Sequence, residues 1–202
     1  MGKRRVPFPT IEFATDIWSV AHIGGYGQHG KLYVYSKSGR MGGKGNDPTI
    51  VLDGEKGDIN LLNADCAEDF SISEQEQDIE IEPGTVMVID DNGKLQRCSM
   101  PYDTRVAGII SGACDCKPGI VLGKKQNSDD YRLPLALMGK VNCKVDASYS
   151  NITVGDMLTT SRTEGHAMKA TSRSKSFGSV IGKALKGIKK GKGLIPILIA
   201  LQ

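Results

Sequence analysis

The sequence predicts an all-β protein in which short, shaft-like strands are followed by a duplicated small β-barrel or β-sandwich domain. The first observation is an internal repeat, because residues 82–111 recur in altered form as residues 153–185. Each copy has a strand opened by a glycine, a polar hairpin and a second strand that contains a glycine: Gly84 and Gly108, then Gly155 and Gly182. The second observation is composition. Glycine supplies 25 of 202 residues and aromatics only 5%, which favours tight turns and thin β layers.

Residues 1–45 are predicted to form an extended assembly arm. Pro7 and Pro9 hold the beginning of the chain extended, because proline fixes φ and lacks a backbone N–H. Residues 15–20 fit either a helical turn or a strand, and the glycine-rich residues 24–30 are typical of a loop. We therefore expect little regular structure before a first short strand at residues 31–35.

Residues 46–78 are predicted to form a short, β shaft-like region followed by a linker. Two runs that alternate apolar and polar side chains, 49–53 and 58–62, flank a turn at 54–57. Each run is too short to bury an apolar face by itself, so the economical structure is a homo-oligomer in which equivalent strands wrap a shared axis. An ordinary β-meander within one chain is the alternative. Residues 64–70 fit either a short helix with an acidic start or a strand that leads into a loop.

Residues 79–202 are predicted to form the β domain that contains the internal repeat. The strand candidates are residues 78–82, 85–90, 106–110, 135–141, 142–145, 156–160, 179–182 and 195–201. Asp91-Asn92-Gly93 predicts a hairpin with a type I′ turn, because asparagine and glycine tolerate positive φ. Pro196 predicts that the last strand is an edge strand or begins at this residue, since proline cannot donate to a neighbouring strand.

The cysteine content and the hydropathy pattern predict a chain that folds in the cytoplasm. Five cysteines, an odd and scattered set, do not suggest a disulfide framework. No apolar run approaches the roughly 18 residues of a membrane span. The first nine residues also lack the apolar stretch of a secretion signal.

The residues that often carry chemistry do not form the pattern of an enzyme. Cys114 and Cys116 have C-x-C spacing, whereas zinc sites use C-x-x-C with a second ligand pair. His166 is close in sequence to Asp156, Ser161 and Glu164, but the glycine pattern of a nucleophile elbow is missing. Phosphate-binding loops are also missing. We therefore expect no catalytic residue, no metal site and no cofactor.

Charge is segregated along the sequence. Residues 53–82 hold eleven acidic side chains and one lysine, whereas residues 161–192 hold nine Lys or Arg and one acidic residue, Glu164. Such segregation would pair subunits end to end, or present a basic surface to an anionic glycan, lipid or nucleic acid; two solvated faces are the simpler alternative. If there is an anionic contact surface, its candidate residues are Arg162, His166, Lys186, Lys189, Lys190 and Lys192.

The chain resembles phage-type tail-fibre and virion-decoration proteins. The resemblance rests on Thr49-Ile-Val-Leu-Asp-Gly-Glu-Lys-Gly-Asp-Ile, which looks like a shaft repeat, and on the paired glycines of the two repeat copies. The run from Tyr102-Asp-Thr-Arg-Val-Ala-Gly to Leu135-Ala-Leu-Met-Gly-Lys-Val is similar to the autoproteolytic chaperone domain at the C-terminus of some phage tail fibres and spikes, over about residues 80–145. The resemblance implies a homotrimer at the end of a phage tail or of a related contractile injection particle. No catalytic residue of that domain can be matched to a position here.

The predicted function is that of a non-enzymatic structural subunit, a trimeric fibre, tip or decoration protein. Its N-terminal arm would contact other particle subunits, and the chain would fold in the cytoplasm before it becomes part of a virion or phage-like particle, where it would be exposed at the surface. One alternative is a surface adhesin that binds an anionic glycan through the basic residues. A second alternative is a self-cleaving fibre chaperone.

Overall fold

The computed structural model describes residues 11–15, 18–24, 31–34, 50–61, 65–115, 118–125 and 130–200. The chain divides into two units, residues 1–63 and 64–202. Strands make up both units, and no α-helix occurs in the described ranges. The all-β prediction is therefore confirmed. The boundary between the units falls inside the segment predicted as shaft and linker.

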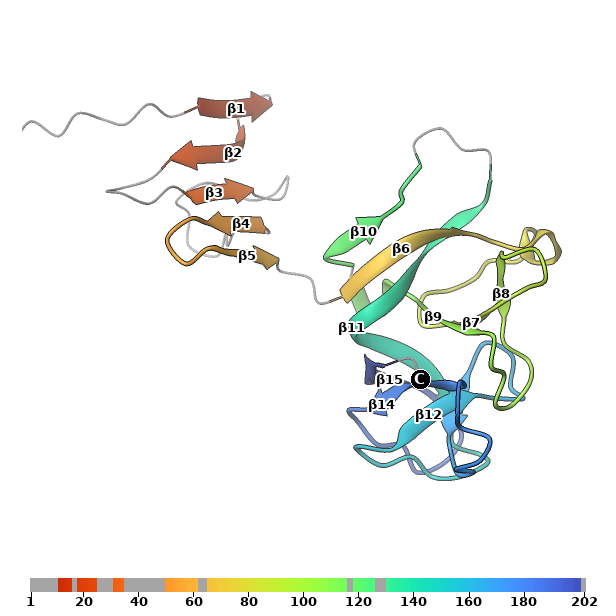
Figure 1. The fold of residues 1–202 in the computed structure, drawn as a ribbon. Helices are drawn as coiled ribbons and strands as arrows, with labels where there is room; N and C mark the ends of the chain where they lie inside the picture. The colour runs from red at the N-terminus through yellow and green to blue at the C-terminus, as the bar shows by residue number, and fades with distance from the viewer. Residues whose placement is uncertain are drawn as a thin grey trace, which may run out of the picture. The chain divides into compact units, whose positions relative to one another are not determined.

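Unit 1 is a single antiparallel meander in which five strands pair in chain order (Figure 1). The strands are β1 (Ile11–Thr15), β2 (Trp18–Gly24), β3 (Lys31–Val34), β4 (Ile50–Asp53) and β5 (Asp58–Leu61). The three short strands predicted from sequence are all present, and they pair with one another inside one chain. Strands β1 and β2 fall within residues 1–45, so the expectation of little regular structure before residue 31 is wrong, because these segments pair with each other and with β3. The first ten residues lie outside the described part of the chain.

Unit 2 contains a closed five-stranded barrel with further strands attached to it. Its first strands are β6 (Asp65–Ser71), β7 (Val86–Ile89), β8 (Leu95–Arg97), β9 (Val106–Ile110) and β10 (Ile120–Leu122). They are followed by β11 (Arg132–Asp146), β12 (Met157–Thr160), β13 (Ala167–Lys169), β14 (Val180–Ala184) and β15 (Lys192–Ile199). The barrel closes because β13, β12, β14, β15 and β11 are neighbours in that order and β11 also pairs with β13. Two single 3₁₀ turns, Glu74–Glu76 and Ala113–Asp115, join strands.

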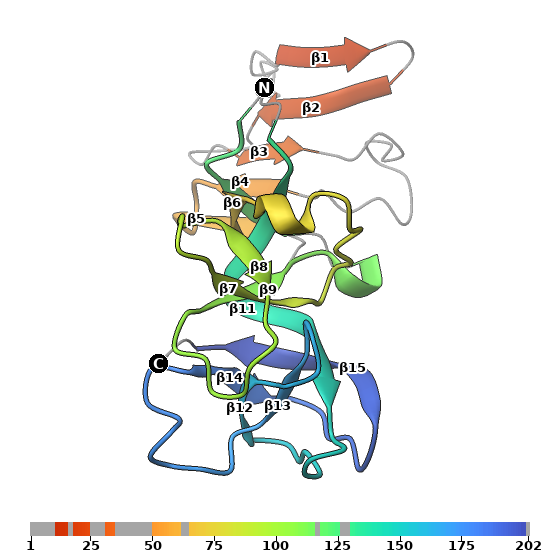
Figure 2. The ribbon, with the colours of Figure 1, turned by 90° about the vertical axis from the view of Figure 1, so that its right-hand side faces the viewer.

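Strand β11 is the element that the barrel and the attached sheet share. Its second half, Gly139–Asp146, pairs with β15, and its first half pairs with β6. Leu135 and Ala136 also pair with β9. Figure 2 shows the consequence, since β7, β8 and β9 lie on one side of β11 and β12, β14 and β15 lie on the other.

The two repeat copies make the same backbone hydrogen bonds. The Gly84 N–H donates to the Ile110 carbonyl at 2.7 Å, and the Gly155 N–H donates to the Ala184 carbonyl at 2.8 Å. Both donor glycines have φ of +89°, a conformation that glycine adopts without strain. The second glycine of each copy, Gly108 or Gly182, pairs with the residue just before a register shift in the copy's first strand. The similarity seen in the sequence is thus a similarity of β-strand geometry.

Alternation along the strands separates the core from the surface. In β15, Ile195, Ile197 and Ile199 are buried inside the barrel, whereas Leu194 and Leu198 are 39% and 43% exposed. Further barrel residues, Leu158 and Ile181, are fully buried, and each such side chain contributes roughly 1.5–3 kcal/mol by leaving water. A second cluster around Met87, Leu95, Ile110 and Leu135 lies beneath β7, β8 and β9.

The structure decides one open alternative and contradicts two strand predictions. Residues 65–71 form strand β6, which is the strand alternative, because this segment pairs with both β11 and β10. The strand predicted at residues 78–82 is absent, because the chain turns there and the Ile79 N–H donates back to the Glu76 carbonyl. Strand β15 lies between β14 and β11, so it is not an edge strand and Pro196 is not its first residue. Pro196 is tolerated because it lies opposite Asn142 just where the pairing with β14 ends, and its carbonyl accepts from the Leu185 N–H at 2.9 Å.

The predicted hairpin at residues 91–93 is present, but its turn is not type I′. Asp90 and Lys94 close a three-residue loop through a hydrogen bond of 2.8 Å from the Asp90 N–H to the Lys94 carbonyl. Gly93 has φ of +74°, whereas Asn92 does not have positive φ. The loop is therefore a type I turn followed by a left-handed glycine, the usual three-residue hairpin connection.

Candidate functional site

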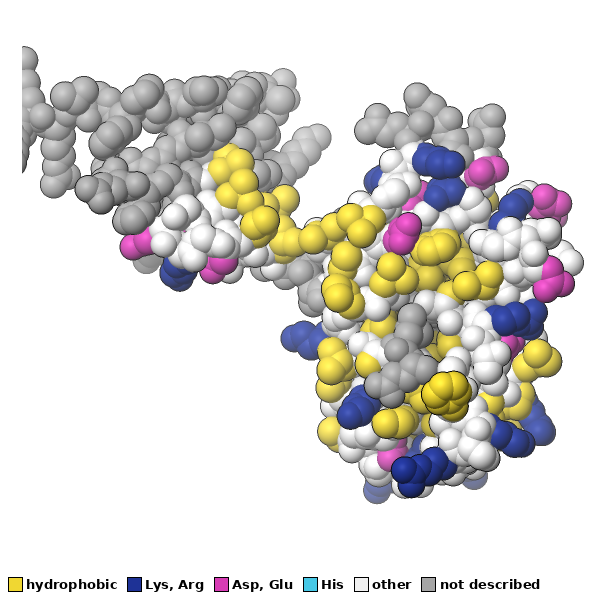
Figure 3. Space-filling view, in the orientation of Figure 1, with side chains coloured by type: hydrophobic (Ala, Val, Ile, Leu, Met, Phe, Trp, Pro, Cys, Tyr) yellow, Lys and Arg dark blue, Asp and Glu magenta, His cyan; other side chains and the backbone are white. Residues whose placement is uncertain are grey.

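The barrel carries a large surplus of positive charge. Residues 139–200 contain eleven Lys or Arg and only three acidic residues, Asp146, Asp156 and Glu164. Figure 3 shows Lys and Arg side chains gathered over the end of unit 2 that the barrel forms. Such a surface attracts negatively charged molecules.

Each of the three acidic residues of the barrel already has a partner within the chain. Asp156 forms an ion pair of 2.8 Å with Lys169, and Glu164 forms one of 2.9 Å with Arg97. Asp146 is buried and accepts from the Thr163 hydroxyl at 2.6 Å. Burial would raise the pKa of Asp146, but hydrogen bonds from Thr163 and Ser148 outweigh burial and hold that pKa below its ordinary value. Three acidic residues therefore cannot neutralise the eleven Lys or Arg side chains of residues 139–200.

The six predicted contact residues lie in three places. Lys186, Lys189 and Lys190 are exposed in the loop that joins β14 and β15. This loop is fixed at its centre, because Ile188 and Ile152 exchange two backbone hydrogen bonds of 2.9 Å. Arg162 is exposed in the hairpin between β12 and β13. The remaining two predicted residues, His166 and Lys192, stand at the beginnings of β13 and β15.

His166 and Lys192 line one open depression of about 700 Å³ on the surface of unit 2. Lys144 lines it as well, opposite Glu82, and the two side chains form an ion pair of 2.7 Å. That hydrogen bond holds the pKa of Glu82 below its usual value. The other lining residues are Pro83, Gly112, Ala113, Cys114, Gly193 and Leu194. The depression therefore gathers two of the six predicted residues, together with Lys144, which was not among the six.

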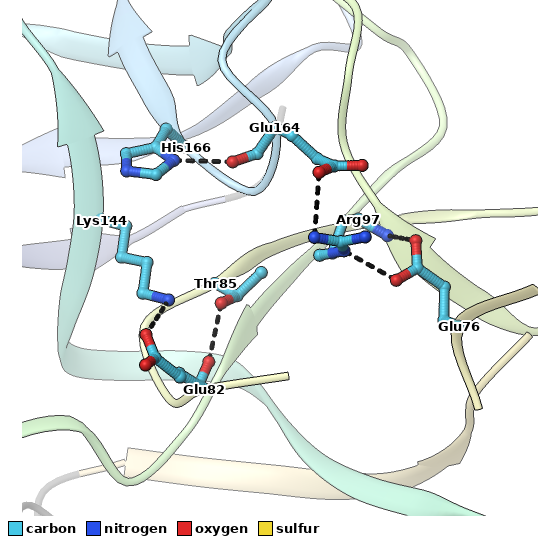
Figure 4. Close-up of polar contacts among 7 residues, drawn as sticks. All are labelled: Glu76, Glu82, Thr85, Arg97, Lys144, Glu164 and His166. Atoms are coloured by element: carbon cyan, nitrogen blue, oxygen red, sulfur yellow. Dashed lines mark hydrogen bonds and ion pairs between the residues drawn. The ribbon is translucent and has the colours of Figure 1, made fainter. Parts of the chain in front are cut away.

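A chain of polar contacts holds the wall of this depression in place (Figure 4). His166 Nδ1 lies 2.7 Å from the backbone carbonyl of Glu164, and the Glu164 carboxylate lies 2.9 Å from Arg97 Nη1. The Arg97 Nε donates in turn to Glu76 at 2.6 Å. His166 is thus fixed by the turn it belongs to, which holds its imidazole ring in one position at the wall of the depression.

The buried cysteines are held as thiols. Cys98 and Cys143 are both fully buried. Burial raises the pKa of the Cys98 thiol to about 11, and burial also raises the pKa of Cys143. Neither thiol is therefore a nucleophile at neutral pH. In the described ranges, no three His, Cys, Asp or Glu side chains are grouped so that they could hold a metal ion.

One face of the unit 1 sheet is apolar and exposed. Leu32, Leu52 and Ile59 form a cross-strand row, and Ile50 and Leu61 form a second row beside it. Directly opposed residues project from the same face of a sheet. Ile59 is 67% exposed, Leu52 39% and Ile50 36%, and Figure 3 shows hydrophobic side chains of this unit at the surface. We call this set the apolar face of unit 1.

Comparisons with known proteins give no family. No protein-family model matches the chain, and no curated protein matches it either. In the described part of the chain, no helix has the length and hydropathy needed to cross a membrane.

Proposed function

We propose that this chain is a non-enzymatic structural subunit of a phage tail or of a contractile-injection-like particle, in which it forms a homotrimeric fibre, tip or decoration protein. The observation that carries this proposal is the exposed apolar face of unit 1. The resemblance of residues 49–59 to a shaft repeat and the duplicated β unit in the second part of the chain support the same class of protein. Buried free thiols agree with folding in a reducing cytoplasm before assembly.

The occupant that fits the apolar face is the same face of further copies. In its described strands, unit 1 is a single sheet, so the rows through Leu52 and Ile50 have no second layer of their own. Apolar rows are stabilised at roughly 25 cal/mol per Å² when water is removed from them, and single sheets of short strands need such cover. Three identical sheets that turn these rows toward a common axis bury them all in one core.

A pair of neighbouring lysine substitutions tests this assembly. Ile59 and Asn60 are adjacent in β5 and project from opposite faces of the sheet. Wild-type protein is expected to have the mass of three chains in multi-angle light scattering. Ile59→Lys is expected to raise the dissociation constant of the oligomer by about 100-fold, because a charge then enters an apolar interface. Asn60→Lys is expected to leave it unchanged.

The result that overturns this assembly is equally direct. A wild-type chain that stays monomeric at all concentrations contradicts the proposed trimer. An oligomer that tolerates Ile59→Lys as well as Asn60→Lys shows that the apolar face of unit 1 is not the interface. Since Ile59 is already 67% exposed in one chain, the substitution leaves the folding of the single chain intact.

A second candidate function is binding of an anionic surface glycan, which the charge surplus of the barrel favours. The double variant Lys189→Glu/Lys190→Glu is expected to weaken binding to immobilised heparin by about 10-fold, because both lysines are exposed in the β14–β15 loop. Lys124→Glu/Lys125→Glu is the matched control, since it makes the same charge change at another exposed lysine pair outside the barrel. Equal losses in the two variants, or no binding by wild type, would contradict a glycan site on the barrel.

A further inference from the structure

Four side chains form an exposed row across the outer surface of the barrel. Met157 pairs with Lys183, Lys183 pairs with Leu198, and Leu198 pairs with Lys140, so the row crosses β12, β14, β15 and β11. Directly opposed residues project from the same face. All four are exposed, and Leu198 and Met157 are 43% and 41% accessible. We call this set the lysine–leucine row.

The two lysines of the row have no acidic partner within the described chain. Between described residues of unit 2, the ion pairs use Lys94, Arg97, Arg105, Arg132, Lys144 and Lys169. The acids nearest in sequence on the barrel strands, Asp146 and Asp156, bond to other groups. The row therefore presents an apolar side chain with an unneutralised cation on each side, which suits a ligand that combines an apolar group with flanking carboxylates.

A segment of this same chain has that chemistry. Asp78, Ile79 and Glu80 follow the 3₁₀ turn at Glu74–Glu76 and are all exposed, with Ile79 38% accessible. Neither carboxylate forms an ion pair with a described residue. We call residues 78–80 the acidic bend.

The acidic bend is held on a fixed support. The Ile79 N–H donates to the Glu76 carbonyl at 3.1 Å, and Ile81 immediately after the bend is only 4% exposed. Glu76 is itself held by Arg97 through a contact of 2.6 Å. Because its two ends are anchored, the bend loses little conformational entropy when a partner binds it.

We propose that the acidic bend of one copy docks on the lysine–leucine row of a neighbouring copy. This inference rests on the proposed homo-oligomer and names a second interface within it. Because the two contacting surfaces differ, the contact is head to tail, and such contacts close into a ring when the rotation between copies allows it. Charge pairing of this kind sets the register between the copies and the choice of partner.

Charge reversal followed by compensation tests the contact. In the full chain, Lys140→Glu/Lys183→Glu is expected to raise the dissociation constant of the oligomer by about 30-fold, because like charges then face each other. Adding Asp78→Lys/Glu80→Lys to the same chain is expected to restore it to within about 3-fold of wild type. Lys124→Glu/Lys125→Glu, which changes the charge equally elsewhere, is the control and is expected to have no effect. Raising the salt concentration is expected to weaken the wild-type oligomer and to abolish the difference between the variants.

The possible results distinguish failure of this docking contact from failure of the proposed trimer. If wild type forms the oligomer and Lys140→Glu/Lys183→Glu leaves the dissociation constant unchanged, the docking contact is wrong and the trimer stands. If wild type is a monomer, both proposals fall. Thermal denaturation reports whether each variant folds. Should the barrel variant fail to fold, Asp78→Lys/Glu80→Lys alone, in an exposed bend, must weaken the oligomer to the same extent, and an unchanged oligomer then overturns the contact.

Discussion

Replacing Gly182 by alanine is expected to lower the free energy of unfolding of unit 2 by about 3 kcal/mol, because the added methyl group has no space. A Cβ at Gly182 would stand 2.1 Å from the backbone carbonyl oxygen of Leu198 and 3.0 Å from the Ile199 Cα. Both atoms belong to the backbone of β15, so no side-chain rotation relieves the overlap. Strands β14 and β15 must separate locally, and the barrel core between them opens. Urea denaturation followed by circular dichroism measures the loss.

Gly191→Ala is the control for this substitution. Gly191 lies in the loop before β15 with φ of +78°, and a Cβ there would meet nothing within 4 Å. The expected loss is about 1 kcal/mol, the cost of a left-handed conformation in a residue that has a side chain. If both variants lose the same stability, the close approach of β15 to Gly182 does not matter. A wild-type-like Gly182→Ala would contradict the packing of the barrel.

The role of these glycines was predictable in kind from the sequence. A glycine inside a strand pattern indicates a bulge or a close backbone approach, and both second-strand glycines lie beside a register shift and a neighbouring carbonyl. Most strands were also predictable from alternation, since short apolar-polar runs and turn residues are local signals. The closure of the barrel was not, because it depends on β11 pairing with β13 and β15, which are distant in sequence.

Two segments show where local sequence does not decide the structure. Residues 65–71 have an acidic, helix-compatible composition, but their neighbours β10 and β11 offer two ladders of hydrogen bonds that a helix would forgo. Considered alone, the sequence of β15 predicts an edge strand because it contains Pro196. A proline is acceptable in this central strand because the pairing with β14 ends at Ile197, the residue next to Pro196. Tertiary pairing overrides local propensity in both cases.

The candidate contact residues show the same division. That Lys186, Lys189 and Lys190 are exposed follows from a glycine-rich, lysine-rich sequence. That His166, Lys192 and Lys144 line one depression follows only from the register of β11 with its neighbours. No sequence signal gathers Lys140 with Lys183 either, because their common neighbour Leu198 belongs to a third strand. Sequence therefore predicts the charge of the surface, and the fold decides its arrangement.

Replacing Arg97 by alanine is expected to lower the free energy of unfolding by about 2 kcal/mol. Arg97 Nε lies 2.6 Å from Glu76 and Nη1 lies 2.9 Å from Glu164 (Figure 4), so one guanidinium joins the 3₁₀ turn before β7 to the hairpin of the second repeat copy. The Glu76 side chain is only 10% exposed. Without Arg97 its carboxylate loses its ionic partner while it remains largely shielded from water, and this desolvation is the main cost.

Two further variants distinguish this cost from the loss of any surface ion pair. Lys94→Ala breaks the neighbouring pair with Glu74, whose side chain is 82% exposed, and is expected to cost less than about 0.5 kcal/mol. Glu76→Gln in the Arg97→Ala background is expected to recover about 1 kcal/mol, because a neutral amide is less costly to bury than an unpaired carboxylate. If Arg97→Ala costs no more than Lys94→Ala, or if Glu76→Gln recovers nothing, the buried carboxylate is not what Arg97 stabilises. The β7–β8 hairpin and the second hairpin would then be held together by their apolar contacts and by backbone hydrogen bonds, from the Val86 N–H to the Gly165 carbonyl and from the Gly165 N–H to the Cys98 carbonyl.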